Sequence, residues 1–192
     1  MDNGKGKSIK VNLYFISIMS DTTDIKMKIC LLGDGGVGKT SLVYRFIQNR
    51  FATDFKSTLG VNLLKHEVVL DNLRITVQLW DLGGQDKYEG LRKLYLDGSQ
   101  GALCVFDKTN KTSFENLEKW VKSFREIRGE KPMTLVGNKL DLKEFIVIDD
   151  DTAKSYATSH NLEYISTSAK TGEQVETAFR SLIHTVIKNT QF

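Results

Sequence analysis

The sequence predicts an α/β fold in which a six-stranded, mostly parallel sheet with one antiparallel edge strand has helices on both faces. Short apolar runs typical of strands alternate along the chain with segments whose apolar residues recur at helical spacing. Such alternation is typical of parallel strands joined by right-handed helical crossovers. Early in the chain, two apolar runs follow each other across a short turn, which indicates an antiparallel hairpin at one edge of the sheet.

Each element follows from its own pattern. The predicted strands lie at 27–33, 61–70, 74–80, 101–107, 133–139 and 162–169. The predicted helices lie at 39–49, 113–128, 150–160 and 173–188. In the first of these helices Leu42 and Phe46 fall on one face, and the hairpin turn is placed at 71–73. Ligands of such sheets bind at the carboxyl ends of the strands, so the residues that follow each strand are the candidates for function.

Composition argues against several kinds of function. The 192 residues, 40% of them apolar, fit one globular domain, which we place at 26–192 behind an N-terminal extension, 1–25. Cys30 and Cys104 lie in strand-like runs, which indicates buried thiols rather than disulfides or a cysteine metal site. A net charge of +3 without a basic block argues against binding to nucleic acid. No window approaches the roughly 18 consecutive apolar residues of a membrane span.

The segment "GDGGVGKTS", residues 33–41, falls between the first predicted strand and the first predicted helix. It matches G-x-x-x-x-G-K-[ST], the P-loop pattern, in which backbone N–H groups and a helix N-terminus surround a phosphate chain. We expect Lys39 to neutralise the outer phosphates and the Thr40 hydroxyl to bind Mg²⁺. The predicted phosphate-binding residues are Gly33, Gly35, Gly36, Val37, Gly38, Lys39, Thr40 and Ser41. The predicted fold is therefore that of a P-loop nucleoside triphosphatase; the alternative is a glycine-rich turn that only caps a helix.

A second polar segment, "LWDLGGQD", closes the third predicted strand. An aspartate at the end of a buried strand can hold Mg²⁺ through water, and we expect Asp81 to do so. Gly84 can offer its N–H to a terminal phosphate without steric hindrance. The amide of Gln85 can both donate and accept, so it can align a water for in-line attack. The alternative is that Asp81 caps the next helix and the glycines only form a loop.

Two further segments, "VGNKLDL" and "TSAKTG", follow the last two predicted strands. A carboxylate such as Asp141 can accept hydrogen bonds from the ring N–H and the exocyclic amine of guanine, whereas adenine would leave it unpaired. Guanine is therefore favoured over adenine. We expect the Ala169 N–H to reach the carbonyl oxygen of the base and the stem of Lys170 to cover one face. The predicted base-binding residues are Asn138, Lys139, Asp141, Ser168, Ala169 and Lys170.

The chain resembles the Ras superfamily of small GTPases over 26–188, and its segments "FKSTLGVN", "TSFENLEKW" and "GNKLDL" look like those of Rab or Ran proteins. The resemblance implies binding of GTP or GDP with Mg²⁺. It implies that Thr58 ligates the metal beside Thr40 and Asp81, and that Phe51 stacks edgewise on guanine. Phe55 replaces a tyrosine that the family often has near the phosphates. The loop before the second strand and the helix after "GGQDKYEGL" would be switches that change order when the terminal phosphate leaves.

The sequence also departs from the Rab pattern. It has "DLGGQD" where most Rab proteins have "DTAGQE", which is similar to Arf proteins, and "TLGVN" is similar to the septation-initiating GTPases of yeasts. The family positions most sensitive for hydrolysis hold Gly35 and Gln85, so the resemblance implies intact catalysis, with Gln85 and Lys39 as the catalytic residues. Neither Arg50 nor Arg92 is placed as an arginine finger, so we expect slow turnover and an activating protein that supplies one.

The two ends of the chain bear on membrane contact. The sequence stops at "KNTQF" without a cysteine for prenylation, and "MDNGKG" lacks the Met-Gly start of myristoylation, so we expect no lipid anchor. The leader "SIKVNLYFISIMSD" fits an interfacial helix, a strand, or an extension upstream of a start at Met19. We expect a cytoplasmic monomer whose membrane contact, if any, goes through a partner or this leader.

The expected function is a guanine-nucleotide switch that slowly hydrolyses GTP, in trafficking-like or signalling regulation. Its partners would be effectors, an exchange factor and an activating protein that read the switches. One alternative is a GTP-holding interaction module with negligible hydrolysis. Another is a P-loop kinase or ATPase, but "NKLD" and "SAK" would then be accidental.

Overall fold

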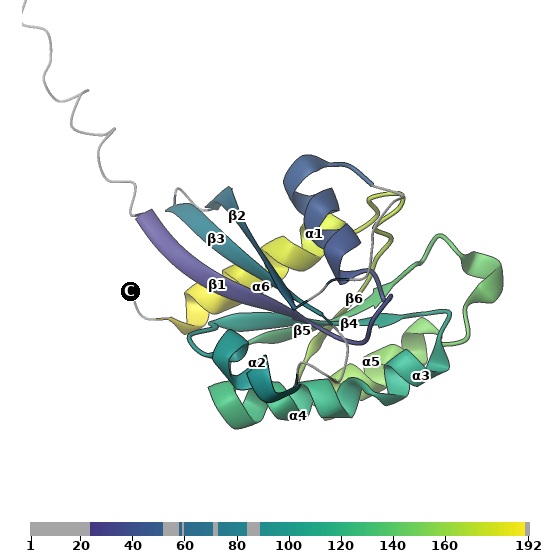
Figure 1. Cartoon of the computed structure of the whole chain (residues 1–192). Helices are drawn as coiled ribbons and strands as arrows, with labels where there is room; N and C mark the ends of the chain where they lie inside the picture. Colours follow the sequence, from purple (N-terminus) through teal and green to yellow (C-terminus); the bar gives the residue numbers. More distant parts are fainter. Residues whose placement is uncertain (1–23, 52–57, 59, 71–72, 84–88, 191–192) are drawn as a thin grey trace, which may run out of the picture.

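Six strands form one sheet in the order β2-β3-β1-β4-β5-β6, and only β2 and β3 run antiparallel (Figure 1). The computed structural model describes residues 24–51, 58, 60–70, 73–83 and 89–190. The strands are β1 Asp24–Leu32, β2 Val61–Leu70, β3 Leu73–Leu82, β4 Gly101–Asp107, β5 Met133–Asn138 and β6 Glu163–Ser166. The helices are α1 Lys39–Gln48, α2 Glu89–Leu96, α3 Lys111–Glu115, α4 Leu117–Arg128, α5 Asp150–Ser159 and α6 Val175–Asn189, with a short 3-10 turn at Lys143–Phe145. The predicted fold class is confirmed.

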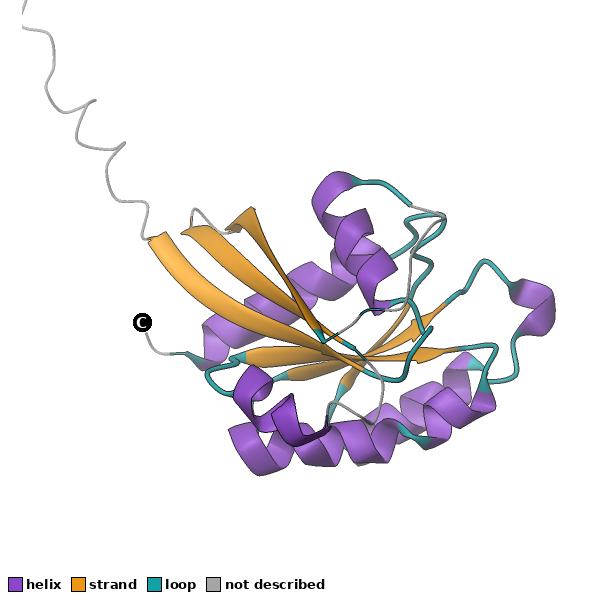
Figure 2. Cartoon of the chain, in the orientation of Figure 1, coloured by secondary structure: helices purple, strands orange, loops and turns teal. Residues whose placement is uncertain are grey.

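Helices cover the sheet on both faces (Figure 2). One face packs against α1 and α6, around buried residues such as Leu42 and Phe179. The other face packs against α2, α4 and α5, around residues such as Trp120 and Phe124. Every residue of β4 and β5 is buried, which explains why these strands are continuous apolar runs without alternation. The two cysteines are buried free thiols, as predicted.

The predicted helix over 113–128 is two helices, so that prediction was wrong in one respect. The helix is interrupted at Asn116, which lies between the end of α3 and the start of α4. At the break, Asn116 Nδ2 donates to Asp34 Oδ2 at 2.7 Å, which joins the helix pair to the loop after β1. Apolar periodicity runs through this point and therefore did not reveal the interruption. The hydrogen bond at the interruption involves a residue far away in the sequence, which local patterns do not predict.

Several predicted boundaries also shift. β1 begins at Asp24 rather than at 27, β3 ends at Leu82 rather than at 80, and α6 begins at Val175 rather than at 173. Leu73 belongs to β3 and pairs with Leu70, so the turn is shorter than predicted, and its residues 71–72 lie outside the described chain. In β6 the strand ends at Ser166, and the chain from Thr167 onward forms a loop. Lys139 adopts a left-handed backbone with a φ of 69°, which ends β5 one residue early.

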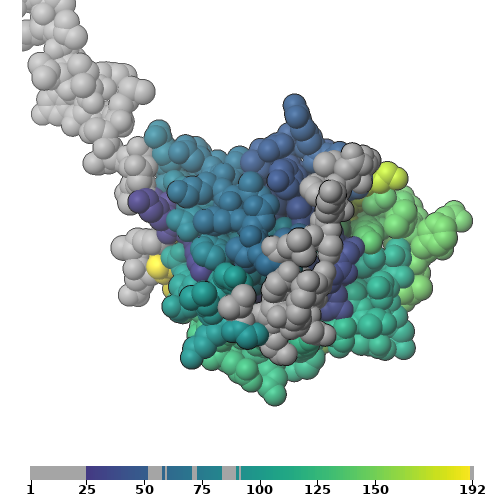
Figure 3. Space-filling model, in the orientation of Figure 1, coloured from purple at the N-terminus to yellow at the C-terminus, as the bar shows by residue number. Residues whose placement is uncertain are grey.

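This topology places a crevice at the carboxyl ends of the strands. The chain leaves β1 toward the face of α1, whereas it leaves the neighbouring strand β4 toward the opposite face, with α3 and α4. Ligands of open α/β sheets bind where connections diverge in this way. In the space-filling view, purple, blue and teal surface from the first half of the chain forms the upper and left part of the molecule, and green surface from the second half forms the lower and right part (Figure 3). No helix in the described part of the chain is long and apolar enough to span a membrane.

Candidate functional site

The loop between β1 and α1 wraps around the side chain of Lys39. Lys39 Nζ donates to the carbonyl oxygens of Gly33 and Asp34, both at 2.7 Å. Burial lowers the pKa of Lys39 from 10.5 to about 8, although the Asp81 and Asp34 carboxylates act in the opposite direction. Gly38 precedes α1 and has no side chain to cap the helix, so the N–H groups of the first turn stay available for an anion. Val37, buried in the core, offers only its backbone to the site.

Asp34, which the sequence analysis did not single out, fixes this loop to the helices on the far face. Its Oδ1 accepts from Trp120 Nε1 at 2.8 Å, and its Oδ2 accepts from Asn116. The guanidinium of Arg92, in α2, lies 4.5 Å from the centroid of the Trp120 ring. The loop after β1 is therefore connected through one aspartate and one indole to the helix that follows β3.

Three oxygen-bearing side chains from separate segments converge beside Lys39. Thr40 Oγ1 donates to Asp81 Oδ2 at 2.5 Å, and Thr58 Oγ1 lies 2.9 Å from Thr40 Oγ1. Either hydroxyl can be the donor in the second contact. Asp81 is fully buried, and burial raises the pKa of its carboxyl.

These oxygens fit a hard divalent cation. Asp81 Oδ1 is buried and has no hydrogen-bond partner in the described part of the chain. A buried carboxylate oxygen without a donor is costly unless a cation or water satisfies it. Mg²⁺ prefers carboxylate, hydroxyl and water oxygens, so the donor set matches its chemistry. The predicted metal residues Thr40, Thr58 and Asp81 are therefore brought together.

Asn138 joins the loop after β1 to the loop after β6. Its Nδ2 donates to Val37 O at 2.9 Å, and its Oδ1 accepts from Ala169 N at 3.1 Å and from Thr167 Oγ1 at 3.3 Å. The Ala169 N–H, expected to reach a base, is therefore engaged with Asn138 in this structure.

Beside this amide lies a cavity of about 410 Å³ that most of the predicted base-binding residues line. Its walls are Gly36, Gly38, Ser41, Phe51, Asn138, Lys139, Asp141, Leu142, Ala169 and Lys170. Ser168 Oγ donates to Asp141 Oδ1 at 2.6 Å, which leaves the other carboxylate oxygen 3.8 Å from Lys170 Nζ. The Lys139 ammonium lies 2.6 Å from Asp107 Oδ2, so its stem is held along the cavity. Asp107 was missed by the sequence analysis, although its place at the end of β4 was a signal.

Three predicted site residues, Phe55, Gly84 and Gln85, lie outside the described residues.

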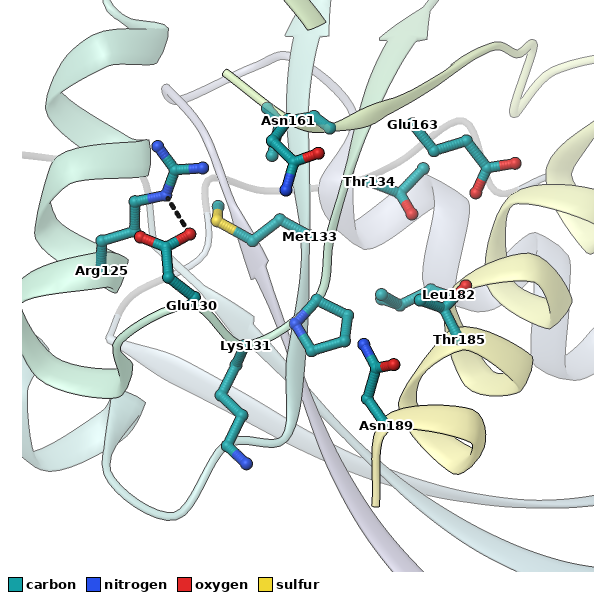
Figure 4. Close-up of a pocket in the computed structure, with 12 residues that line it drawn as sticks. Arg125, Glu130, Lys131, Met133, Thr134, Asn161, Glu163, Leu182, Thr185 and Asn189 are labelled. Atoms are coloured by element: carbon teal, nitrogen blue, oxygen red, sulfur yellow. Dashed lines mark ion pairs between the residues drawn. The ribbon is translucent and has the colours of Figure 1, made fainter. Parts of the chain in front are cut away.

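A second cavity, of about 220 Å³, lies far from the loops, at the amino-terminal ends of β5 and β6 (Figure 4). Arg125 Nε and Glu130 Oε2 form an ion pair of 3.5 Å beside it. None of the predicted site residues that the structure describes lines this cavity.

Comparison with known proteins identifies the family. Residues 28–188 match the Ras family. The chain belongs to the Ras family. The GTP-binding protein ypt3 of Schizosaccharomyces pombe is 38% identical over 169 residues, which cover 88% of this chain and 79% of that protein. The Ras-related protein Rab-11B of Dictyostelium discoideum is 41% identical over 162 residues, 84% of this chain and 74% of that protein. The Ras-related protein RABA1c of Arabidopsis thaliana is 38% identical over 164 residues, 85% of this chain and 76% of that protein.

These matches confirm a Rab-like small GTPase, and the chain is accordingly an enzyme of the GTP-hydrolysing class. The alternatives of a bare helix-capping turn and of an unrelated P-loop kinase are thereby set aside. The similarity to Arf proteins in "DLGGQD" is a local feature within this Rab-like chain.

The glycines of the phosphate loop of this small GTPase differ in what a methyl group would meet. Gly38 has a φ of 99°, and a Cβ there would lie 2.3 Å from Asn138 Nδ2. At Gly35 the φ is not in the left-handed region and a Cβ would meet nothing within 4 Å. We therefore expect Gly38→Ala to lower the free energy of unfolding of the nucleotide-free protein by about 2 kcal/mol or more. Gly35→Ala should change it by no more than about 1 kcal/mol. Urea unfolding of both variants measures this, and equal losses would contradict the loop geometry.

The lowered pKa of Lys39 predicts proton uptake when phosphates bind. At pH 8 the ammonium is about half deprotonated in the empty protein, since its pKa is lowered to about 8. Phosphate oxygens favour the charged form and raise the pKa again, so binding of GDP should take up about half a proton at pH 8. Affinity should accordingly fall as the pH rises above this value. Calorimetry in two buffers of different ionisation enthalpy measures the uptake. Lys39→Met should abolish it, and wild-type binding without uptake would contradict the assignment.

Proposed function

We propose that this Rab-like protein is a Mg²⁺-dependent guanine-nucleotide switch that hydrolyses bound GTP slowly to GDP and phosphate. One observation carries the proposal: the Asn138 amide ties the phosphate loop to the loop after β6 around a cavity of about 410 Å³. A nucleotide would extend from this cavity to the N-terminus of α1. The domain would begin with β1 at Asp24, two residues before the predicted boundary at 26, and run to 192, with the residues before β1 as an extension outside the switch itself.

The phosphates would lie over the loop that begins at Gly33 and ends at Ser41. Its backbone N–H groups and the start of α1 suit an anion. The Lys39 ammonium, which now contacts two carbonyl oxygens, would turn to the outer phosphates and stabilise the charge that develops during transfer.

Mg²⁺ would be held by the Thr40 and Thr58 hydroxyls and, through water, by Asp81. When bound, the metal neutralises charge on the phosphates. The protein's own part is to hold these oxygens together, and the Thr40–Asp81 contact supports this arrangement. Thr58 belongs to the loop before β2, which would change its order when the terminal phosphate leaves. Its hydroxyl lies 2.9 Å from Thr40 Oγ1, so the two hydroxyls could ligate one metal together.

The base would occupy the cavity, with guanine favoured by Asp141. The Ser168 hydroxyl orients this carboxylate, which would accept hydrogen bonds from the ring N–H and the exocyclic amine. The stems of Lys139 and Lys170 would cover the faces of the ring, with Phe51 at its edge. Ala169 would offer its N–H to the carbonyl oxygen of the base by sharing it with Asn138.

Hydrolysis would depend on Gln85, which would align the attacking water in line with the terminal phosphate, while Gly84 would donate its N–H to that phosphate. Arg92 is 7% exposed and stacked on Trp120, and Arg50 is exposed at the end of α1. This supports slow intrinsic turnover that an activating protein accelerates by supplying an arginine.

The names of the relatives suggest the setting. Because Rab-11B and RABA1c are Ras-related proteins, we infer a role in membrane-trafficking-like or signalling regulation, as the Rab-like resemblance implies. Effectors, an exchange factor and an activating protein would read the two switch segments. The protein would act as a cytoplasmic monomer, reaching membranes through partners or through its N-terminal extension.

Single-turnover hydrolysis of bound GTP with Mg²⁺ tests the switch. The wild type should hydrolyse GTP with a rate constant on the order of 10⁻⁴ to 10⁻² s⁻¹. Gln85→Leu should slow this at least about tenfold while GTP stays bound, because the aligned water is lost. Gln48→Leu, an exposed glutamine at the end of α1, is the matched control and should leave the rate unchanged. Tight GTP binding without turnover in the wild type would instead favour the GTP-holding interaction module.

A further inference from the structure

We propose that Arg45 is a positioning residue for base recognition, which holds the loop after β6 in place from the helix that begins at the phosphate loop. The inference rests on the proposed guanine-nucleotide site and adds to it a residue that belongs to neither the phosphate nor the base motif. It would make the release of the base depend on the position of α1.

The guanidinium of Arg45 reaches from α1 to two consecutive carbonyl oxygens of the loop. Nε donates to Ala169 O at 2.9 Å and Nη2 donates to Lys170 O at 2.5 Å. On its other side, Nη1 donates to Asn49 O at 3.1 Å and lies 3.3 Å from Asn49 Oδ1. The guanidinium is therefore fixed between the end of its own helix and the loop.

The loop that Arg45 holds carries three of the predicted base-binding residues. Ser168 orients Asp141, Ala169 bonds to Asn138, and Lys170 lines the cavity. The chain then turns back over the arginine stem: Gly172 N donates to Ser168 O at 2.8 Å, and a Cβ on Gly172 would lie 3.5 Å from Arg45 Cδ. A displacement of the loop would thus move all of these groups together.

Only an arginine fits this position. The planar guanidinium directs separate N–H groups at several acceptors at once. A lysine ammonium is a point charge on a flexible stem and cannot contact the same carbonyl oxygens in one fixed geometry. Arg45 also lies less than two turns after Lys39, so one rigid helix connects the groups proposed for the phosphates with the loop proposed for the base.

Nucleotide release from the full-length protein tests the inference. Dissociation rates are measured in Mg²⁺ for GDP and for 2-aminopurine riboside diphosphate, which lacks the carbonyl oxygen that Ala169 would read and the ring N–H from which Asp141 would accept a hydrogen bond. The variants are Arg45→Ala and Arg45→Lys, the latter retaining charge and helix propensity in case the alanine variant folds poorly. Arg128→Ala is the matched control, because Arg128 Nε also donates to a backbone carbonyl, Ser99 O at 2.9 Å, but at the opposite end of the sheet.

We expect Arg45→Ala to release GDP about tenfold faster than the wild type, with a smaller acceleration for the 2-aminopurine nucleotide. Arg45→Lys should recover only part of the loss, and Arg128→Ala should release both nucleotides like the wild type. Wild-type GDP release in Arg45→Ala would overturn the inference, as would equal acceleration of both nucleotides or the same acceleration in Arg128→Ala. A wild type that binds no guanine nucleotide would instead overturn the proposed function itself.

Discussion

The side-chain amide of Asn138 is the interaction on which the rest of the site depends. It is buried at the end of β5 and satisfies the carbonyl of Val37, the N–H of Ala169 and the hydroxyl of Thr167. Removing it would leave buried polar groups of two loops without hydrogen-bond partners, which costs folding free energy. Its position also explains why Gly38 has no side chain, since a Cβ there would collide with the amide. One residue thus sets the distance between the phosphate loop and the loop after β6.

The proposed nucleotide and its metal would each compensate a buried charged group of the site. Burial lowers the pKa of Lys39 and raises the pKa of Asp81, so both groups resist their charged forms. A phosphate beside the ammonium and a cation beside the carboxylate would compensate each of them. Three contacts hold the loops around the site in place. Asp34 accepts a hydrogen bond from Trp120, Lys139 forms an ion pair with Asp107, and Arg45 donates to the loop after β6. Binding should therefore stabilise the folded protein strongly, which suits a protein that keeps its nucleotide bound.

Much of this molecule could be predicted from sequence, because its elements follow from local patterns. The strands, the hairpin and the placement of the motifs at strand ends needed only periodicity and glycine positions. The break at Asn116 could not be predicted, since periodicity continues through it and the bond to Asp34 joins distant residues. The same holds for Arg45 and Trp120, whose partners lie in other segments. The roles of Phe55, Gly84 and Gln85 stay predictions, because these residues lie outside the described chain.

The measurement that tests the central claim most directly is the base preference of Asp141→Asn, obtained from equilibrium binding of GDP and xanthosine diphosphate in Mg²⁺. Asp141 is held by Ser168 with one oxygen directed away from that bond, and a carboxylate there selects the two N–H donors of guanine. The account predicts that the wild type prefers GDP and that Asp141→Asn, whose amide can donate to the second carbonyl of xanthine, prefers xanthosine diphosphate. An unchanged preference for GDP in the variant would remove Asp141 from the base site and contradict the arrangement of the loops after β1, β3, β5 and β6 around a guanine nucleotide.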